Sequence, residues 1–153
     1  DNISAGLGGG NLGAAQATMT VSEAAKHYMG VDEDGVLADT DLRRRITEHL
    51  METKAFQLTV RRAADEAKSN QGPSSATSIM KYAGAKIAQD RNELMVEAMG
   101  HSGLGWDGEG FEGNELATVR AWLRSKGNSI EGGTSEINLN VVSKRVLALP
   151  DPK

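Results

Sequence analysis

The longest helical pattern in the chain runs from Asp39 to Lys68, and this stretch constrains the fold more than any other. Its apolar and small side chains recur every three or four residues, which is the spacing of one face of an α-helix. This stripe consists of Leu42, Ile46, Leu50, Thr53, Gln57, Val60, Ala64 and Ala67. Asp39 or Thr40 can cap the helix start, because side-chain oxygens accept hydrogen bonds from free backbone N–H groups. The pattern predicts one long helix with a single buried face.

Four further segments share this helical spacing. They are Ala14–Met29, Ser74–Met99, Glu115–Lys126 and Thr134–Pro150. No alternating strand pattern of useful length is present. Helices that each carry one apolar face and are joined by short loops pack best as an antiparallel bundle. The sequence therefore predicts an all-α fold, an antiparallel four-helix-type bundle with an extra C-terminal helix.

We expect one domain over residues 1–153, with a glycine-rich start and first helix over 1–35 and the helical bundle over 36–150. Asn114 is expected to cap the helix over Glu115–Lys126, which carries Leu116, Val119 and Leu123 inward. Glycine occupies six of the fourteen positions in Gly100–Gly113. This composition argues against a regular element there, and we expect Trp106 and Phe111 to hold the loop to the core.

Composition and charge exclude several classes of function. The 153 residues carry a net charge of −4, which argues against a nucleic-acid partner. The chain has no cysteine, so it has no disulfide framework, thiolate metal site or cysteine nucleophile. No apolar run approaches the roughly 20 residues that span a bilayer, and no signal peptide opens the sequence. These features indicate no membrane partner, and we expect a cytoplasmic protein.

The residues on their own offer little catalytic or metal-binding apparatus. His27, His49 and His101 are far apart in sequence and form no i, i+4 pair, so no metal site is predicted. The glycines at 8, 10 and 13 match G-x-G-x-x-G, but only seven residues precede them, too few for the strand that a dinucleotide fingerprint requires. The run Arg43–Arg45 is interpreted as a salt-bridged helix face, because Glu48 lies four residues after Arg44.

The stretch Gly127–Pro150, GNSIEGGTSEINLNVVSKRVLALP, is a glycine-broken loop that leads into one helix. Thr134 or Ser135 can cap that helix, and Glu136 falls in its first turn, the favourable end of the helix dipole for an acid. Such a start offers N–H donors and close backbone access, which suits an anionic or polar ligand such as a phosphate. The same residues can equally form a capped loop that binds nothing.

The run from GGTSEI to RVLALP resembles the C-terminal signature of the acyl-CoA dehydrogenases, flavoenzymes that oxidise acyl-CoA thioesters. The similarity is strongest over Gly72–Pro150. It implies the helical C-terminal domain of an FAD-dependent acyl-CoA dehydrogenase, whose N-terminal helical domain and β-domain are absent here. The domain would contribute the oligomer core, part of the FAD site and the acyl pocket, and we expect it to be inactive alone.

The resemblance also implies site residues. Thr134 and Glu136 match family positions near the cofactor. Glu97, Gly100 and His101 stand in the family turn Q-x-x-G-G-x-G, which meets the FAD of a neighbouring subunit. Two of them depart from the pattern, because Gln is replaced by Glu97 and the second Gly by His101.

No catalytic residue is expected in this chain. In one branch of the family the glutamate base immediately precedes the Gly-Thr pair, where this sequence has Gly132. Glu131 lies one residue too early for that position. In another branch the base lies on a helix that would precede or surround Asp1. The third alternative is that the base has been lost.

The partners implied by the resemblance are an acyl-CoA substrate, a flavin electron acceptor such as electron-transferring flavoprotein, and further subunits in a homo- or hetero-oligomer, a dimer or tetramer. A second interpretation is a non-catalytic, degenerate partner subunit or oligomerisation module of a heteromeric acyl-CoA dehydrogenase. Gly132 and the altered turn at Glu97 and His101 favour this interpretation.

Overall fold

The computed structural model describes residues 19–69 and 75–150, and within these ranges the chain is helical and has no strand. Its α-helices are α1 (Val21–Met29), α2 (Thr40–Lys68), α3 (Thr77–Met99), α4 (Gly113–Ser125) and α5 (Ser135–Val141). Short helical turns continue three of them: η1 (Gly100–Leu104), η2 (Lys126–Ser129) and η3 (Val142–Val146). The predicted all-α fold is confirmed. No helix in these two ranges is long and apolar enough to cross a membrane.

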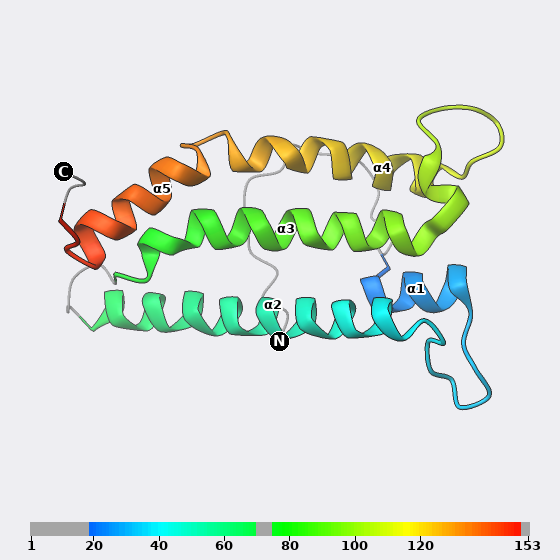
Figure 1. Ribbon diagram of the computed structural model, residues 1–153, viewed down its shortest axis with the longest axis horizontal. Helices are drawn as coiled ribbons and strands as arrows, with labels where there is room; N and C mark the ends of the chain where they lie inside the picture. The colour runs from blue at the N-terminus through cyan, green and yellow to red at the C-terminus, as the bar shows by residue number, and fades with distance from the viewer. Residues whose placement is uncertain (1–18, 70–74, 151–153) are drawn as a thin grey trace.

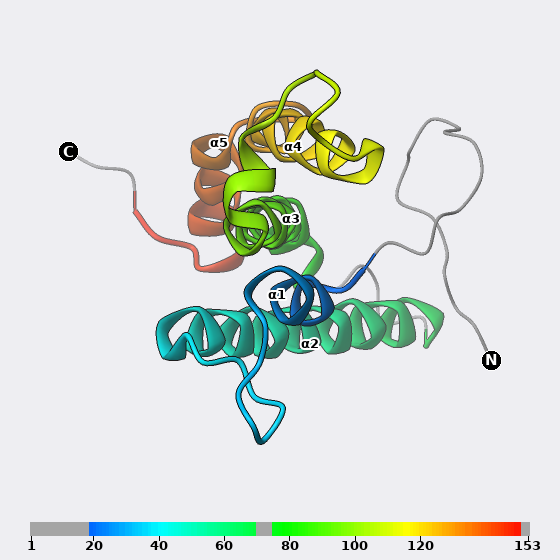
Figure 2. The same ribbon diagram turned by 90° about the vertical axis from the view of Figure 1, so that its right-hand side faces the viewer.

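Helix α3 lies at the centre of the arrangement (Figure 1). Helix α2 runs antiparallel to it on one side, and α4 followed by α5 runs antiparallel to it on the other (Figures 1 and 2). The short helix α1 packs beside α3 at the end of the bundle where α2 begins. The result is an antiparallel bundle, in which the elements on either side of α3 are separated from each other by it.

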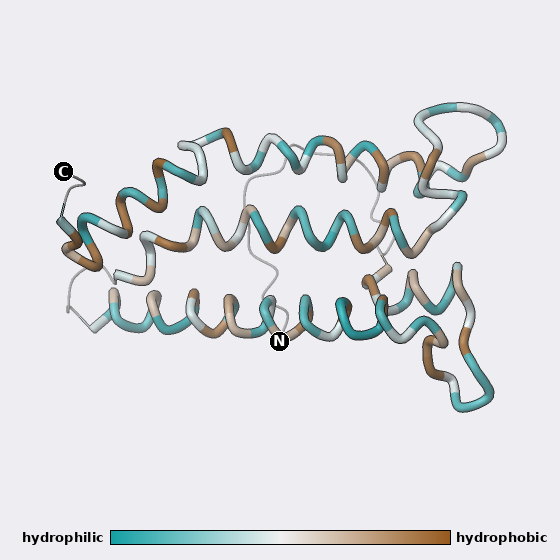
Figure 3. Tube along the Cα trace, viewed as in Figure 1, coloured by the Kyte–Doolittle hydropathy of each residue, from teal (hydrophilic) through white to brown (hydrophobic). Residues whose placement is uncertain are grey.

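One apolar core joins α1, α2 and α3. Its buried residues are Val21, Ala24, Ala25, Leu37, Leu42, Ile46, Leu94, Met95 and Ala98. Hydrophilic residues predominate along α2, with apolar residues between them (Figure 3). Ion pairs join some of these hydrophilic residues, since Arg44 contacts Asp41 at 2.8 Å and Glu48 at 2.7 Å. The predicted salt-bridged arginine face is therefore confirmed.

The apolar stripe of α2 is buried only near its start. Leu42 and Ile46 are 2% and 5% exposed, but Leu50 and Val60 on the same stripe are 51% and 39% exposed. The difference follows from the length of α1, which spans nine residues against the 29 of α2. Among the described residues, α1 covers only the first part of the α2–α3 face.

The helix starts follow local capping chemistry. Asp39 caps α2, because its Oδ1 accepts a hydrogen bond from Leu42 N at 2.9 Å, as predicted. Thr20 caps α1 in a capping box with Glu23, so this helix begins at Val21. The expected residues 14–18 of that helix lie outside the described ranges. Asn114 does not cap α4; the helix begins at Gly113, and Glu112 is its N-cap.

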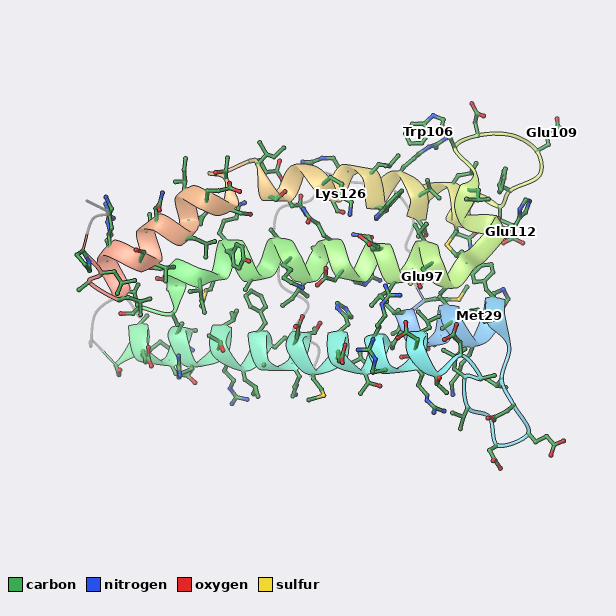
Figure 4. The ribbon with its side chains drawn as sticks, in the orientation of Figure 1. Met29, Glu97, Trp106, Glu109, Glu112 and Lys126 are labelled. Carbon is green, nitrogen blue, oxygen red and sulfur yellow. The ribbon has the colours of Figure 1, made fainter. Side chains whose placement is uncertain are left out.

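The loop after α3 differs from the prediction in two ways. Its first five residues form the 3₁₀ turn η1, because Gly103 lets the chain pack closely against Val96 of α3. Trp106 is 55% exposed and does not enter the core. It is held by Arg120, which stacks over the indole at 5.3 Å and donates to the Trp106 carbonyl at 2.8 Å. Figure 4 shows Trp106 beside α4 and Glu109 on the outer part of the loop.

The carboxylate of Glu115 ties α4 to α1 and η1. Glu115 is 7% exposed, and its Oε2 accepts a hydrogen bond from the backbone N–H of Glu112 at 2.8 Å. This hydrogen bond has the largest effect on the pKa of Glu115 and lowers it. Burial raises the pKa, but by less. The hydroxyls of Ser102 and Tyr28 lower it further. The ionised form of Glu115 is therefore the one that stabilises the fold.

This lowered pKa predicts an acid-sensitive stability. A carboxyl whose folded pKa is depressed stabilises the fold fully above its unfolded pKa, about 4.3 for glutamate, and loses that contribution as the pH falls through the folded value. We expect the urea midpoint of the unmodified chain to fall more steeply than that of Glu115→Gln between about pH 5 and pH 3. Glu23, whose pKa is also lowered by hydrogen bonds from Thr20, is retained in both proteins. Parallel midpoint curves for the two proteins would contradict this assignment.

Candidate functional site

The loop directly before α5, residues 132–134, turns sharply and is called the corner below. Its backbone conformation requires glycine. Gly132 and Gly133 have φ values of 67° and 98°, in the left-handed region that other residues resist. Thr134 is the N-cap of α5, and its Oγ1 accepts a hydrogen bond from Ile137 N at 3.4 Å. Asn138 fixes the same corner, because its Nδ2 donates to the carbonyls of Gly133 and Thr134 at 3.0 and 2.8 Å. Residues of α5 and its N-cap therefore fix the backbone of the corner.

Lys81, on the central helix α3, donates hydrogen bonds to this corner and to the turn before it. Lys81 Nζ, on α3, donates to the carbonyl of Asn128 at 2.5 Å and to that of Gly133 at 3.4 Å. These two carbonyls stand at opposite ends of the loop between η2 and α5. A half-buried cation therefore holds the loop against α3, and it adds positive charge next to the glycine pair.

The carboxylates near the corner have separate surroundings. Glu136 is exposed in the first turn of α5, and hydrogen bonds from its own backbone N–H and then from the Thr134 hydroxyl lower its pKa. Glu131 is exposed and accepts a hydrogen bond from Arg124 of α4 at 2.8 Å. Gly132 itself has no side chain, and a glutamate there would need a left-handed backbone that costs of order 1–3 kcal/mol. Position 132, directly before the Gly133–Thr134 pair, therefore carries no carboxylate.

The turn at the other end of α3 carries the remaining predicted residues. Glu97 lies on the last turn of α3, and its Oε1 accepts a hydrogen bond from Arg45 of α2 at 2.6 Å. Gly100 ends the helix with φ 54°, and no atom lies within 4 Å of the position that a Cβ would take there. His101 is exposed and stacks on Phe111, with ring centroids 6.3 Å apart. This turn is thus open to solvent, and the Glu97 carboxylate is paired with a cation.

The two groups of predicted residues lie far apart in the chain. Thr134 and Glu136 lie near the start of α3, where Lys81 holds the corner, whereas Glu97, Gly100 and His101 lie at its end (Figures 1 and 4). Lys81 and Glu97 are 16 residues apart on one helix, which corresponds to about 24 Å along its axis. The structure brings together the members of each group and does not bring the two groups together.

Sequence reasoning missed Lys81 and Arg45 as partners of the candidate site. Lys81 shares a helix face with Gly84, Ala85 and Ala88, and all four residues border a groove between α2 and α3. A single lysine among small residues on one helix face was a signal that its ammonium group reaches a buried hydrogen-bond acceptor. Arg45 gave no comparable signal, because Glu97 is 52 residues away in sequence.

Among the described residues, no group of three His, Asp or Glu side chains is placed to hold a metal ion.

Together these features define a helical-bundle domain. A loop with two left-handed glycines precedes its last helix, and Lys81 of the central helix binds that loop. The profile of the family described as "Acyl-CoA dehydrogenase, C-terminal domain" matches residues 5–147. The chain therefore belongs to the acyl-CoA dehydrogenase C-terminal domain family.

A solved structure has a similar fold. It is the crystal structure of the ChsE4-ChsE5 complex from Mycobacterium tuberculosis, with a TM-score of 0.63 and 18% sequence identity. The match covers 86% of this chain and 35% of that chain, so the present chain spans about a third of the solved protein's length. No curated protein sequence matches this chain.

Proposed function

We propose that this chain acts as the C-terminal domain of an FAD-dependent acyl-CoA dehydrogenase, an enzyme that introduces an α,β double bond into an acyl-CoA thioester. The observation that carries the proposal is the corner Gly132–Gly133–Thr134, with its left-handed glycines and its capping threonine. Family membership supports the general kind of protein. The cofactor contacts, acyl pocket and partners are the parts that we propose.

The residues at both ends of α3 are chemically suited to a flavin nucleotide. The corner supplies the Thr134 hydroxyl and the nearby charge of Lys81. At the turn, the open space beside Gly100 admits a ligand, and Arg45 offsets the negative charge of Glu97. A bound FAD would accept the hydride from the acyl chain, and the residues of this domain would bind and orient it. We assign Thr134, Glu136, Glu97, Gly100 and His101 to cofactor contacts.

The separation of the two groups implies that each flavin is shared between subunits. One copy would supply the corner at Thr134 and another the turn at Gly100, since about 24 Å of helix separates them within one copy. The domain would then form the core of a dimer or tetramer. Several apolar side chains of α5 and the segment after it are exposed and available for such contacts: Ile137, Leu139, Val146, Leu147 and Leu149.

The proposed assembly predicts an oligomer in solution. In sedimentation velocity we expect the isolated chain to form a dimer or tetramer, because exposed apolar patches associate. Ile137→Asp should shift this equilibrium toward monomer at least fivefold. Met51→Asp, which changes an exposed apolar side chain of α2 (67% exposed, against 57% for Ile137), should leave the equilibrium unchanged. A chain that stays monomeric at high concentration contradicts the proposed subunit contacts.

We propose no catalytic residue in this chain, because Gly132 has no side chain and the Glu131 carboxylate is bound by Arg124. The domain alone should therefore be inactive. The test is to mix the purified chain with FAD and an acyl-CoA and to follow flavin bleaching. We expect no bleaching, whereas the flavin of the full-length parent, assayed in parallel without an electron acceptor, should be bleached by the acyl-CoA. Turnover by the isolated chain would refute this part of the proposal.

A second function is favoured by one specific observation, the glycine at position 132. We propose as the alternative that the parent is a non-catalytic partner subunit, whose helices assemble with an active relative. The changes to Glu97 and His101 in the turn support it as well. Flavin analysis of the purified full-length parent separates the two functions. Stoichiometric flavin in a homo-oligomer excludes the partner-subunit role, and flavin bound only after an active relative is added supports it.

A further inference from the structure

The chain contains two Asp–Gly pairs, Asp34–Gly35 and Asp107–Gly108, and both aspartates are exposed. An aspartate followed by glycine can isomerise without an enzyme, because glycine has no side chain to hinder the approach of its nitrogen to the preceding carboxyl group. Sequence and exposure do not distinguish the two pairs. The hydrogen bonds around each pair therefore decide which of them can react in the folded chain.

The isomerisation consumes no reagent other than water. The glycine nitrogen loses its proton and attacks Cγ of the protonated aspartate carboxyl group. A C–N bond forms, one water leaves, and a five-membered succinimide ring closes. Water then opens the ring: attack at the former side-chain carbonyl restores aspartate, whereas attack at the main-chain carbonyl breaks the original peptide bond and gives isoaspartate. A glycine N–H that is held in a hydrogen bond is not free to take the first step.

The pair Asp34–Gly35 lies in a turn that is held by hydrogen bonds. Gly35 N donates to the carbonyl of Asp32 at 3.0 Å, and Asp34 N donates to Asp32 Oδ1 at 3.1 Å. Val36 N donates to the same Oδ1 at 2.8 Å, and its carbonyl accepts from Asp32 N at 2.9 Å. The nitrogen that would have to attack is already a donor, and the residues on both sides of it are fixed.

The pair Asp107–Gly108 lies in the middle of a loop whose ends are held. Arg120 binds the carbonyl and the indole of Trp106 at one end, and the ring of Phe111 packs against the start of the loop. No atom lies within 4 Å of the position that a Cβ would take on Gly108. Among the described residues, no group accepts a hydrogen bond from the Gly108 N–H. Its nitrogen is therefore free to approach the Asp107 carboxyl group, in a loop that projects from the bundle (Figures 1 and 2).

We propose that Asp107–Gly108 is a site of spontaneous isoaspartate formation in the folded chain, and that the hydrogen-bonded turn protects Asp34–Gly35 from the same reaction. Isomerisation adds one methylene group to the backbone of the loop and leaves the net charge unchanged. The modified loop adjoins the turn at His101, because Phe111 stacks on His101. The inference concerns a covalent change in this loop and does not depend on flavin binding.

The test is to incubate the full 153-residue chain at neutral pH for several weeks in water enriched in oxygen-18. Opening of the succinimide leaves an oxygen-18 atom on the aspartyl residue that reacted. Peptide mapping with electron-transfer fragmentation then distinguishes isoaspartate from aspartate. We expect about tenfold more isoaspartate at position 107 than at position 34. Equal yields, a larger yield at position 34, or none at position 107 would overturn the proposal.

The same incubation in guanidinium chloride shows whether the fold causes the difference. In the unfolded chain the hydrogen bonds of the turn are lost, so the yields at positions 34 and 107 should agree within a factor of about two. A tenfold difference that persists without the fold would show that the neighbours in sequence determine it, and it would overturn the structural assignment.

A matched pair of variants checks the protection at Asp34. Asp32→Ala removes the carboxylate that accepts hydrogen bonds from Asp34 and Val36, and the yield at position 34 should rise at least fivefold. Glu33→Ala changes an exposed side chain of the same turn, and the yield should stay the same. The yield at position 107 is the internal reference in both variants. Equal yields at position 34 in the two variants would overturn the protection assigned to the turn.

Discussion

Replacing Gly103 by alanine is expected to destabilise the fold by about 3 kcal/mol, at the upper end of what overpacking costs. Gly103 is buried in η1, and a Cβ added there would overlap the carbonyl oxygen of Val96 and lie 3.1 Å from its Cγ1. The obstructing atom belongs to the backbone of α3, so it cannot turn aside as the tip of a side chain can. Thermal unfolding should show a midpoint about 6–12 °C lower, given 2–4 °C per kcal/mol for a chain of this size.

Gly110→Ala is the matched control for this change. Gly110 lies in the same loop, and no atom is within 4 Å of the added Cβ. Neither Gly103 nor Gly110 has a positive φ, so the two variants differ in packing and not in backbone strain. We expect Gly110→Ala to alter stability by less than about 0.5 kcal/mol, as most surface substitutions do. Equal midpoints for the two variants would show that η1 does not pack tightly against Val96.

Gly103 illustrates which parts of the fold could be predicted from the sequence. The helices were predictable, because apolar spacing and capping residues are local signals; Asp39, for example, caps α2 as its position indicated. The tight packing of η1 was not predictable, because it depends on the approach of two segments. Trp106 was expected to hold the loop to the core, yet Arg120 on the following helix holds it at the surface.

In the candidate site, too, local features were predictable and the spatial arrangement of distant segments was not. Thr134 or Ser135 was predicted to cap α5, and Thr134 is the cap; the signal lies within four residues of the helix start. Its distance from the turn at Gly100 could not be predicted, because it depends on which end of α3 each loop meets. The family resemblance implies that the turn at Gly100 meets the FAD of a neighbouring subunit, but it does not give the distance between that turn and Thr134. The separation of the two groups along α3 supports the proposed sharing of the site between copies.

Replacing Lys81 by methionine is expected to loosen the corner before α5 and to lower stability by about 2 kcal/mol. The ammonium group donates to the carbonyls of Asn128 and Gly133, and hydrogen bonds to charged groups contribute roughly 1.5–3 kcal/mol. Methionine keeps most of the apolar stem but has no donor. The Asn128 carbonyl would lose the ammonium group, and the Gly133 carbonyl would keep only its hydrogen bond from Asn138. The loop between η2 and α5 would then be free to move away from α3.

Hydrogen exchange measures this loosening directly. The amides of Ile130 and Glu131 both donate to the Gly127 carbonyl, at 3.0 and 2.9 Å, and they should exchange about tenfold or more faster in Lys81→Met, since 1.4 kcal/mol corresponds to a factor of ten. Lys86→Met is the control, because Lys86 lies on the same helix but pairs with Asp90 and Glu52 on an exposed face. It should leave the exchange of these amides unchanged. If both variants behave alike, Lys81 does not hold the corner, and the position of Gly132–Thr134 must be set by Asn138 and the α5 cap alone.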